Sequence, residues 1–274
     1  MKIASASFPL TTFPNAEHWV SQLQSQVRVA SEKGAKLILF PEYVTASLLG
    51  IKNDWQVWDK LWQDSITRFA KEYQLLVVGG THLITTKEGL RNRCLLAWPD
   101  GSIDFQDKLQ PTPWEYRWNL PRTNQVKVFR HEGTVLAVPI CYDVEFPEGV
   151  RVAVAAGAEI LLVPSWTDDE HGFWRVRHCA QSRCIENVVY VAHAPLVGGI
   201  KELPEFEEAS GSAGILTPCD IDFPKKGIAA EGAWNKTDTI IADLDIKRLR
   251  QLRTTGTVTP WADRRPESDY KKIL

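Results

Sequence analysis

The sequence predicts a mixed α/β fold in which helices pack on the outer faces of mixed sheets. Short apolar runs alternate along the chain with longer segments that have helical spacing. Residues 93–98 and 102–105 flank Pro99-Asp100-Gly101, which predicts a β-hairpin. No internal repeat, coiled-coil heptad or Pro/Gly/Ser-rich linker interrupts the 274 residues, so a single domain is expected.

The N-terminal half contains the clearest element signals. Residues 2–8 read as a strand, and Asn15 is placed to cap a helix that Gly34 ends. Apolar residues recur on one face of this helix and are expected to pack inward: Ala16, Trp19, Leu23, Val27 and Ala30. The elements expected next are a short buried strand at 37–40, an amphipathic helix from about 53–54, and a strand at 75–79.

The C-terminal half continues the alternation. The strands expected there are 135–140, 160–163, 188–192, 213–217 and 239–242. The helices expected are 147–156, 168–186 and a short one after Asp243. Residues 198–214 are rich in Gly, Glu and Ser and are expected to form a long loop.

Charge and composition exclude several classes of protein. The chain has 32 Lys+Arg and 34 Asp+Glu, a formal charge of −2, which is unlike a dedicated nucleic-acid binder. Residues 187–200 are apolar but too short to span a membrane. The N-terminus lacks the apolar core of a secretory signal, and the five cysteines are scattered. We therefore expect a soluble cytoplasmic protein with reduced thiols, and no nucleic-acid or membrane partner.

Common cofactor and metal motifs are absent. The chain has no G-x-x-x-x-G-K-[ST] loop, no G-x-G-x-x-G after the first strand, no H-E-x-x-H and no G-x-S-x-G. The six histidines are dispersed, and the adjacent His178 and Cys179 could not both reach one metal ion from a helix. We expect neither a metal nor an organic cofactor.

Three polar residues directly follow predicted strands. Cys141 lies between an apolar strand and a helix, where free backbone N–H groups favour an anion. Glu42 follows the strand at 37–40, and Lys108 follows the hairpin. A carboxylate can take a thiol proton, and an ammonium can stabilise an oxyanion. Taken singly, Cys141 is better explained as a buried structural thiol, and Glu42 and Lys108 are better explained as solvated surface charges. Spacing alone does not bring the three together.

The segments around these residues resemble the catalytic blocks of the nitrilase (carbon–nitrogen hydrolase) superfamily. The matching blocks are Phe40-Pro41-Glu42-Tyr43, Asp107-Lys108-Leu109-Gln110-Pro111 and Ile140-Cys141-Tyr142-Asp143-Val144-Glu145-Phe146-Pro147-Glu148. They occur in the family's order and at similar separations. Flanking similarity at 157–165, 183–191 and 255–266 extends the resemblance over essentially the whole chain.

The resemblance implies a four-layer αββα sandwich formed by one domain, residues 1–274, with about 256–274 as a C-terminal tail at an oligomer interface. It implies that Glu42 is the general base and acid, Lys108 stabilises the oxyanion and Cys141 is the nucleophile. Glu115 matches a second glutamate that positions substrate and lysine, and the backbone N–H of Tyr142 completes the oxyanion hole. It also implies a homodimer or larger homo-oligomer.

The expected reaction is hydrolysis of a linear amide or carbamoyl-type small molecule by water, through a thioester. Nitrile hydrolysis by the same residues is an alternative, although Cys141-Tyr142-Asp143 differs from the Cys-Trp-Glu usual in true nitrilases. A Cys–His hydrolase and a non-catalytic scaffold or sensor also remain open. Aromatic residues such as Trp114 and Trp166 are expected to wall the pocket.

Acidic residues near the pocket have two explanations. Glu145 and the run 168–170 could recognise a cationic amine. The run is equally explained by the preference of acidic side chains for a helix N-terminus.

Overall fold

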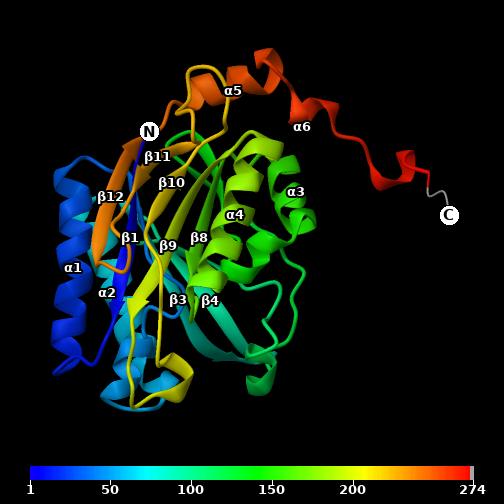
Figure 1. Ribbon diagram of the computed structural model, residues 1–274. Coiled ribbons are helices and arrows are strands. Elements are labelled where there is room, and N and C mark those ends of the chain that lie inside the picture. Colours follow the sequence, from blue (N-terminus) through cyan, green and yellow to red (C-terminus); the bar gives the residue numbers. More distant parts are fainter. Residues whose placement is uncertain (272–274) are drawn as a thin grey trace.

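A computed structural model describes residues 1–271, and within them twelve strands form two sheets that meet face to face (Figure 1). The first sheet has the order β5-β4-β3-β2-β1, and β12 pairs with β1. Its strands are β1 Lys2–Leu10, β2 Leu37–Leu39, β3 Leu76–Thr86, β4 Gly89–Ala97, β5 Ile103–Asp107 and β12 Asp238–Asp243.

The second sheet has the order β9-β8-β7-β6, with β10 on the other side of β9 and β11 beyond it. Its strands are β6 Val128–His131, β7 Thr134–Ala137, β8 Ile160–Ser165, β9 Tyr190–Gly198, β10 Gly214–Leu216 and β11 Ile228–Glu231. The two sheets are joined where the ends of β1 and β9 pair in parallel, from Phe8 opposite Leu196 to Leu10 opposite Gly198.

Helices cover both outer faces. Helices α1 (Ala16–Glu32) and α2 (Asp59–Tyr73) lie against the first sheet, and α3 (Pro147–Ala155) and α4 (Glu170–Asn187) lie against the second (Figure 1). The C-terminal part contains α5 (Ile246–Thr255) and α6 (Pro260–Asp263), after which the chain extends away from the body (Figure 1). The short 3-10 helices are η1 Ala46–Gly50, η2 Trp55–Trp58, η3 Glu115–Trp118, η4 Cys141–Glu145, η5 Pro204–Phe206 and η6 Glu267–Asp269.

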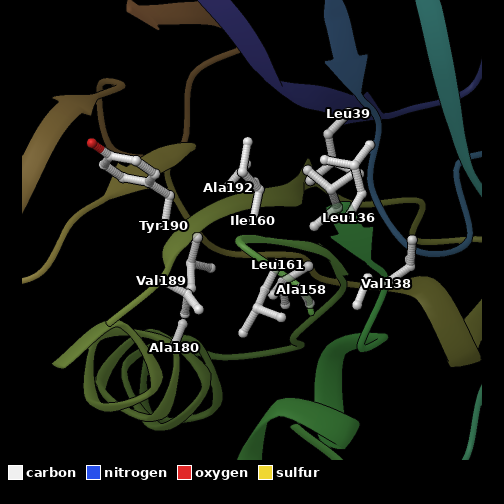
Figure 2. Packing of buried hydrophobic residues seen from close by; sticks show 14 of the residues in the cluster. Leu39, Leu136, Val138, Ala158, Ile160, Leu161, Ala180, Val189, Tyr190 and Ala192 are labelled. Carbon is white, nitrogen blue, oxygen red and sulfur yellow. The ribbon is translucent and has the colours of Figure 1, made fainter. Parts of the chain in front are cut away.

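Two hydrophobic clusters hold these layers together. One lies between the sheets and continues under α3 and α4; in it, Leu39 of β2 and Leu136 of β7 meet from opposite sheets (Figure 2). The other lies between the first sheet and α1 and α2, where Trp19, Leu23 and Val27 form the buried face of α1. Burying each such side chain contributes about 1.5–3 kcal/mol. The four layers confirm the predicted αββα sandwich.

Several predicted boundaries were wrong. Val188 adopts a left-handed conformation as the C-cap of α4, so strand β9 begins at Tyr190 and continues to Gly198 rather than ending at residue 192. The helix expected from residue 53 begins with the 3-10 turn η2 before α2, and the strand expected at 75–79 extends to Thr86. Strand β7 ends at Ala137, and the short strands β6 and β11 were not predicted.

Candidate active site

Glu42 is held by a close approach of two chain segments. It follows β2 in a turn whose Pro41 carbonyl accepts a hydrogen bond from the Thr81 N–H at 3.0 Å. Gly80 in β3 has a φ of +66°, and a Cβ added there would lie 2.1 Å from the Pro41 oxygen. Glycine is required by both the left-handed backbone and the contact. The turn is further fixed by the Tyr43 N–H, which donates to Thr81 Oγ1 at 2.8 Å.

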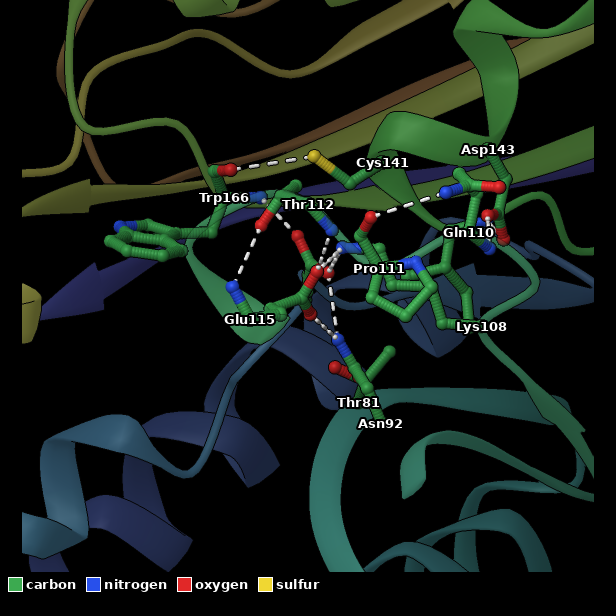
Figure 3. Close-up of polar contacts among 12 residues, drawn as sticks. Thr81, Asn92, Lys108, Gln110, Pro111, Thr112, Glu115, Cys141, Asp143 and Trp166 are labelled. Carbon is green, nitrogen blue, oxygen red and sulfur yellow. Dashed lines mark hydrogen bonds and ion pairs between the residues drawn. The ribbon is translucent and has the colours of Figure 1, made fainter. Parts of the chain in front are cut away.

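Lys108 lies between two carboxylates in the interior. Its backbone N–H donates to Asn92 O at 2.9 Å, which continues the β4–β5 pairing one residue beyond β5. Its Nζ donates to Glu42 Oε1 at 2.7 Å. It also donates to Glu115 Oε2 at 2.7 Å (Figure 3). The three side chains are each at most 3 % exposed, so this is a desolvated ion cluster. Charge-assisted hydrogen bonds of this kind fix the positions of the three side chains and favour their charged forms.

The two glutamates accept further hydrogen bonds that the sequence patterns did not predict, one donor being shared and two binding Glu115 alone. The Asn92 amide donates to Glu42 Oε1 at 2.8 Å and to Glu115 Oε1 at 2.9 Å. The Tyr43 hydroxyl donates to Glu115 Oε1, and the Thr112 N–H donates to Glu115 Oε2 at 2.8 Å. Tyr43 adjoins Glu42 in the sequence, which is a usable signal. Asn92 lies inside a strand with no local signal.

Cys141 is presented on a strained turn. The chain leaves β7, and Cys141 has a φ of +46°, an uncommon conformation for a residue other than glycine. Ser165 Oγ donates to Sγ at 3.4 Å. Sγ donates to Trp166 O at 3.4 Å (Figure 3). The Trp166 N–H donates to Glu42 Oε2 at 3.1 Å. The backbone of a single residue, Trp166, therefore contacts both the thiol and the carboxylate.

Tyr142 is the second residue of η4, where a backbone N–H has no acceptor within its own helix. Tyr142 and Lys108 both line the cleft onto which Cys141 opens. Two donors of this type can stabilise an oxyanion.

Asp143 joins the segment after Lys108 to the turn that carries Cys141. Its carboxylate accepts the Ile140 N–H at 3.1 Å and the Leu109 N–H at 3.1 Å. It also accepts the Gln110 N–H at 2.8 Å (Figure 3). Despite these donors, burial raises the pKa of Asp143 to about 7.

The pKa values of the three buried charged groups are shifted in different directions. Burial raises the pKa of Glu42, outweighing the opposing charge of Lys108. Burial acts in the same sense on Glu115, but its contacts with Lys108 prevail and leave the pKa of Glu115 lowered. Lys108 is desolvated too, yet the charges of Glu115 and Glu42 raise its pKa well above the ordinary value. Glu42 is therefore the carboxylate suited to exchange a proton, while Glu115 and Lys108 stay charged.

The Cys141 thiol is neutral at pH 7. Burial and the adjacent Glu42 charge raise the pKa of Cys141 far above its ordinary value, although Lys108 opposes them. Formation of the thiolate at neutral pH therefore requires proton transfer during attack. None of the histidines among residues 1–271 lines the cleft or hydrogen-bonds to Cys141, which weighs against a Cys–His hydrolase.

The cleft has a volume of about 780 Å³. Trp114 and Trp166 line it with ring centroids 5.0 Å apart, and Phe206 packs 4.9 Å from Trp166. Glu145 also lines the cleft, where its carboxylate pairs with Arg175 of α4 at 3.1 Å. A volume of this size accommodates a small organic molecule.

Comparison with known proteins gives the family. The model of the family described as carbon-nitrogen hydrolase matches residues 2–254. The chain belongs to the carbon-nitrogen hydrolase family. This carbon–nitrogen hydrolase is thus a member of the nitrilase superfamily, which confirms the resemblance drawn from its sequence blocks.

Individual relatives agree with that assignment. The chain is 32 % identical to a probable hydrolase, YhcX, of Bacillus subtilis over 99 % of its own length, and it spans 56 % of that relative. It is 26 % identical to a deaminated glutathione amidase of Synechocystis, covering 91 % of this chain and 94 % of the relative. The NitN amidase structure from Nesterenkonia sp. AN1 superposes with a TM-score of 0.77 at 22 % identity, covering 98 % of both chains, which shows the fold.

Two further properties concern the described residues alone. Within residues 1–271, no group of three or more His, Cys, Asp or Glu side chains is arranged to hold a metal ion. None of the helices in the same residues has both the length and the apolar character needed to cross a bilayer.

Proposed function

We propose that this carbon–nitrogen hydrolase cleaves the C–N bond of a small linear amide or carbamoyl compound through a thioester on Cys141. The observation that carries the proposal is the position of Lys108 between Glu42 and Glu115, at 2.7 Å from each. The two carboxylates have oppositely shifted pKa values. Glu42, with the raised pKa, is suited to proton transfer, and Glu115, with the lowered pKa, is suited to stabilise the charge of Lys108. The Synechocystis relative's name, which denotes an amidase, supports an amide substrate.

The first half-reaction forms the acyl-enzyme. Glu42 takes the Sγ proton of Cys141 as sulfur bonds to the amide carbon, and the carbonyl π electrons move to oxygen. The Lys108 ammonium and the Tyr142 N–H stabilise that oxyanion. When the oxyanion collapses, the C–N bond breaks and Glu42 protonates the nitrogen, so ammonia or an amine leaves and a thioester remains.

The second half-reaction returns the free enzyme. Glu42 takes a proton from water as its oxygen attacks the thioester carbon, and the same donors hold the new oxyanion. The C–S bond then breaks, the carboxylic acid leaves, and the thiol recovers its proton. Glu115 keeps Lys108 charged through both halves, with Asn92 and Tyr43 holding Glu115 in place.

The test is an ammonia-release assay on small amides, ω-amides of dicarboxylic acids, N-carbamoyl compounds and nitriles. Cys141→Ala and Glu42→Gln are expected to abolish release, and Cys219→Ala, which removes an exposed thiol, is the matched control. Mass spectrometry of the wild type during turnover should show an acyl adduct on Cys141. Undiminished release by Cys141→Ala would refute the proposal. If a nitrile were the best substrate of the panel, the proposed amide hydrolysis would be replaced by nitrile hydrolysis as the function.

A further inference from the structure

The mouth of the catalytic cleft carries a concentrated negative charge. Outside the buried cluster, six acidic side chains line it against the two basic side chains Arg175 and Lys201. The acidic residues are Glu145, Asp168, Asp169, Glu205, Glu207 and Glu208. The whole chain has a formal charge of only −2, so the negative excess is localised at the cleft. We propose that the substrate is an amide whose far end carries a cationic amine; this inference rests on the proposed function.

Two of these carboxylates are already compensated. Glu145 pairs with Arg175 at 3.1 Å, and Asp169 caps helix α4 by accepting the Gly172 N–H at 2.6 Å. Among residues 1–271, no ion pair within 4.0 Å involves the other four acidic residues at the mouth or Lys201. Four carboxylates and one ammonium, none of them in an ion pair within residues 1–271, therefore line the cleft. A cleft lined mainly by one sign of charge attracts the opposite charge.

The segment that supplies three of these carboxylates is fixed in place. Phe206 is 1 % exposed and packs against Tyr43 and Trp166, with ring centroids 5.7 and 4.9 Å away. The Ile200 N–H donates to Phe206 O at 2.8 Å, and Trp166 Nε1 donates to Glu208 O at 3.2 Å. The backbone that carries the acidic side chains is thus tied to the aromatic wall of the cleft.

The aromatic wall favours the same ligand. Trp114, Trp166 and Tyr43 line the same cleft as the Cys141 thiol and the acidic side chains. Aromatic faces attract ammonium groups through their quadrupole, most strongly where water is excluded. An alkyl chain can therefore lie along the rings while its terminal ammonium reaches the carboxylates. A terminal carboxylate in the same place would be repelled by the net charge.

The test compares three amides of similar length. 5-Aminopentanamide carries an ammonium where hexanamide has a methyl group, and 4-carbamoylbutanoate carries a carboxylate. At low ionic strength, kcat/KM for the cationic amide is expected to exceed that for hexanamide at least roughly tenfold, and the anionic amide is expected to be the poorest. Raising NaCl from about 10 mM to about 500 mM should lower the ratio of kcat/KM for the cationic amide to kcat/KM for hexanamide, because salt screens exposed charges.

Variants assign the preference to named side chains. The double variant Glu205→Gln/Glu207→Gln should lower the ratio of cationic to neutral kcat/KM several-fold. Glu202→Gln is the matched control, since Glu202 is an exposed acid of the same segment that does not line the cleft. It should leave the ratio and both rates unchanged. A thermal melt of each variant verifies folding.

The outcomes separate this inference from the proposed function. Hydrolysis of hexanamide or the anionic amide as fast as the cationic one would overturn the inference and leave C–N hydrolysis intact. A preference that survives in the double variant would overturn the role of the acidic mouth. Failure to release ammonia from all three amides, with no acyl adduct on Cys141 from any compound of the wider panel, would overturn both proposals.

Discussion

The Asp143 carboxylate accepts a hydrogen bond from the backbone N–H of Gln110 at 2.8 Å. This bond connects the segment after Lys108 to the turn that presents Cys141, over a sequence separation of 33 residues. A second bond from Leu109 and a third from Ile140 share the same carboxylate. The distance between Lys108, the proposed oxyanion donor, and Cys141, the proposed nucleophile, therefore depends on a side chain that has no chemical step in the proposed mechanism.

The titration of Asp143 predicts a specific pH dependence of stability. Burial raises its pKa to about 7 in the folded protein, against about 3.9 for an unfolded aspartate. Between these values the folded state binds the proton more tightly, so this group's contribution to the free energy of unfolding falls as pH rises from about 4 to about 7. Above pH 7 the contribution is constant.

Asp143→Asn removes that titration. The slope of unfolding free energy against pH, measured by urea denaturation between about pH 4.5 and 6.5, should become less negative by up to about 1.4 kcal/mol per pH unit. The variant should also be less stable, because one amide oxygen cannot replace both carboxylate oxygens as acceptors. An unchanged slope would contradict a proton on Asp143 in this range.

Asn92→Ala should impair catalysis more than stability. It removes the amide that hydrogen-bonds to both Glu42 and Glu115, so the two glutamates lose a contact that fixes their positions relative to each other. Misplacement of a catalytic group costs on the order of 10²-fold in rate, and a fall in kcat/KM of that order is expected. Steady-state kinetics with the best amide provide the measurement. Asn53→Ala, at an exposed residue outside the cleft, should behave as wild type, and equal rates for both variants would refute the role of Asn92.

Gly80→Ala should displace Glu42. Its methyl group would lie 2.1 Å from the Pro41 carbonyl, so the turn carrying Glu42 must move. Gly133 is a matched control, because its φ of +72° resembles the +66° of Gly80 while a Cβ there meets no atom within 4 Å. Gly133→Ala should cost only the backbone strain, roughly 1–2 kcal/mol. Urea denaturation and kinetics should show a larger loss of stability, together with a loss of kcat/KM, for Gly80→Ala alone.

The loss of activity at low pH should follow the protonation of Glu42. Its carboxylate must be ionised to accept the thiol proton, and burial raises the pKa of Glu42 above its ordinary 4.5. The value of kcat/KM is therefore expected to fall as pH decreases through a midpoint above 4.5. A pH profile on a neutral amide, with circular dichroism verifying the fold at each pH, measures this midpoint. A midpoint at or below 4.5 would exclude Glu42 as the general base.

Local patterns predicted most elements because they report burial and turn chemistry. Asn15 accepts the His18 N–H at 3.1 Å, and the four-residue spacing of Trp19, Leu23 and Val27 matches the buried face of α1. The same patterns failed at β9, because its extension to Gly198 is stabilised by pairing with β1. No local signal reports a partner strand almost two hundred residues away.

The sequence alone indicated the family and predicted that residues suited to thiol-dependent hydrolysis follow three strands. Tertiary structure decided which of them meet. Lys108 reaches Glu42 across 66 residues and Asn92 reaches it across 50, and those contacts, with burial, set which carboxylate holds a proton. Turn and helix signals depend on neighbours in the chain, whereas pKa values and the charge of a cleft depend on neighbours in space, which only the folded arrangement specifies.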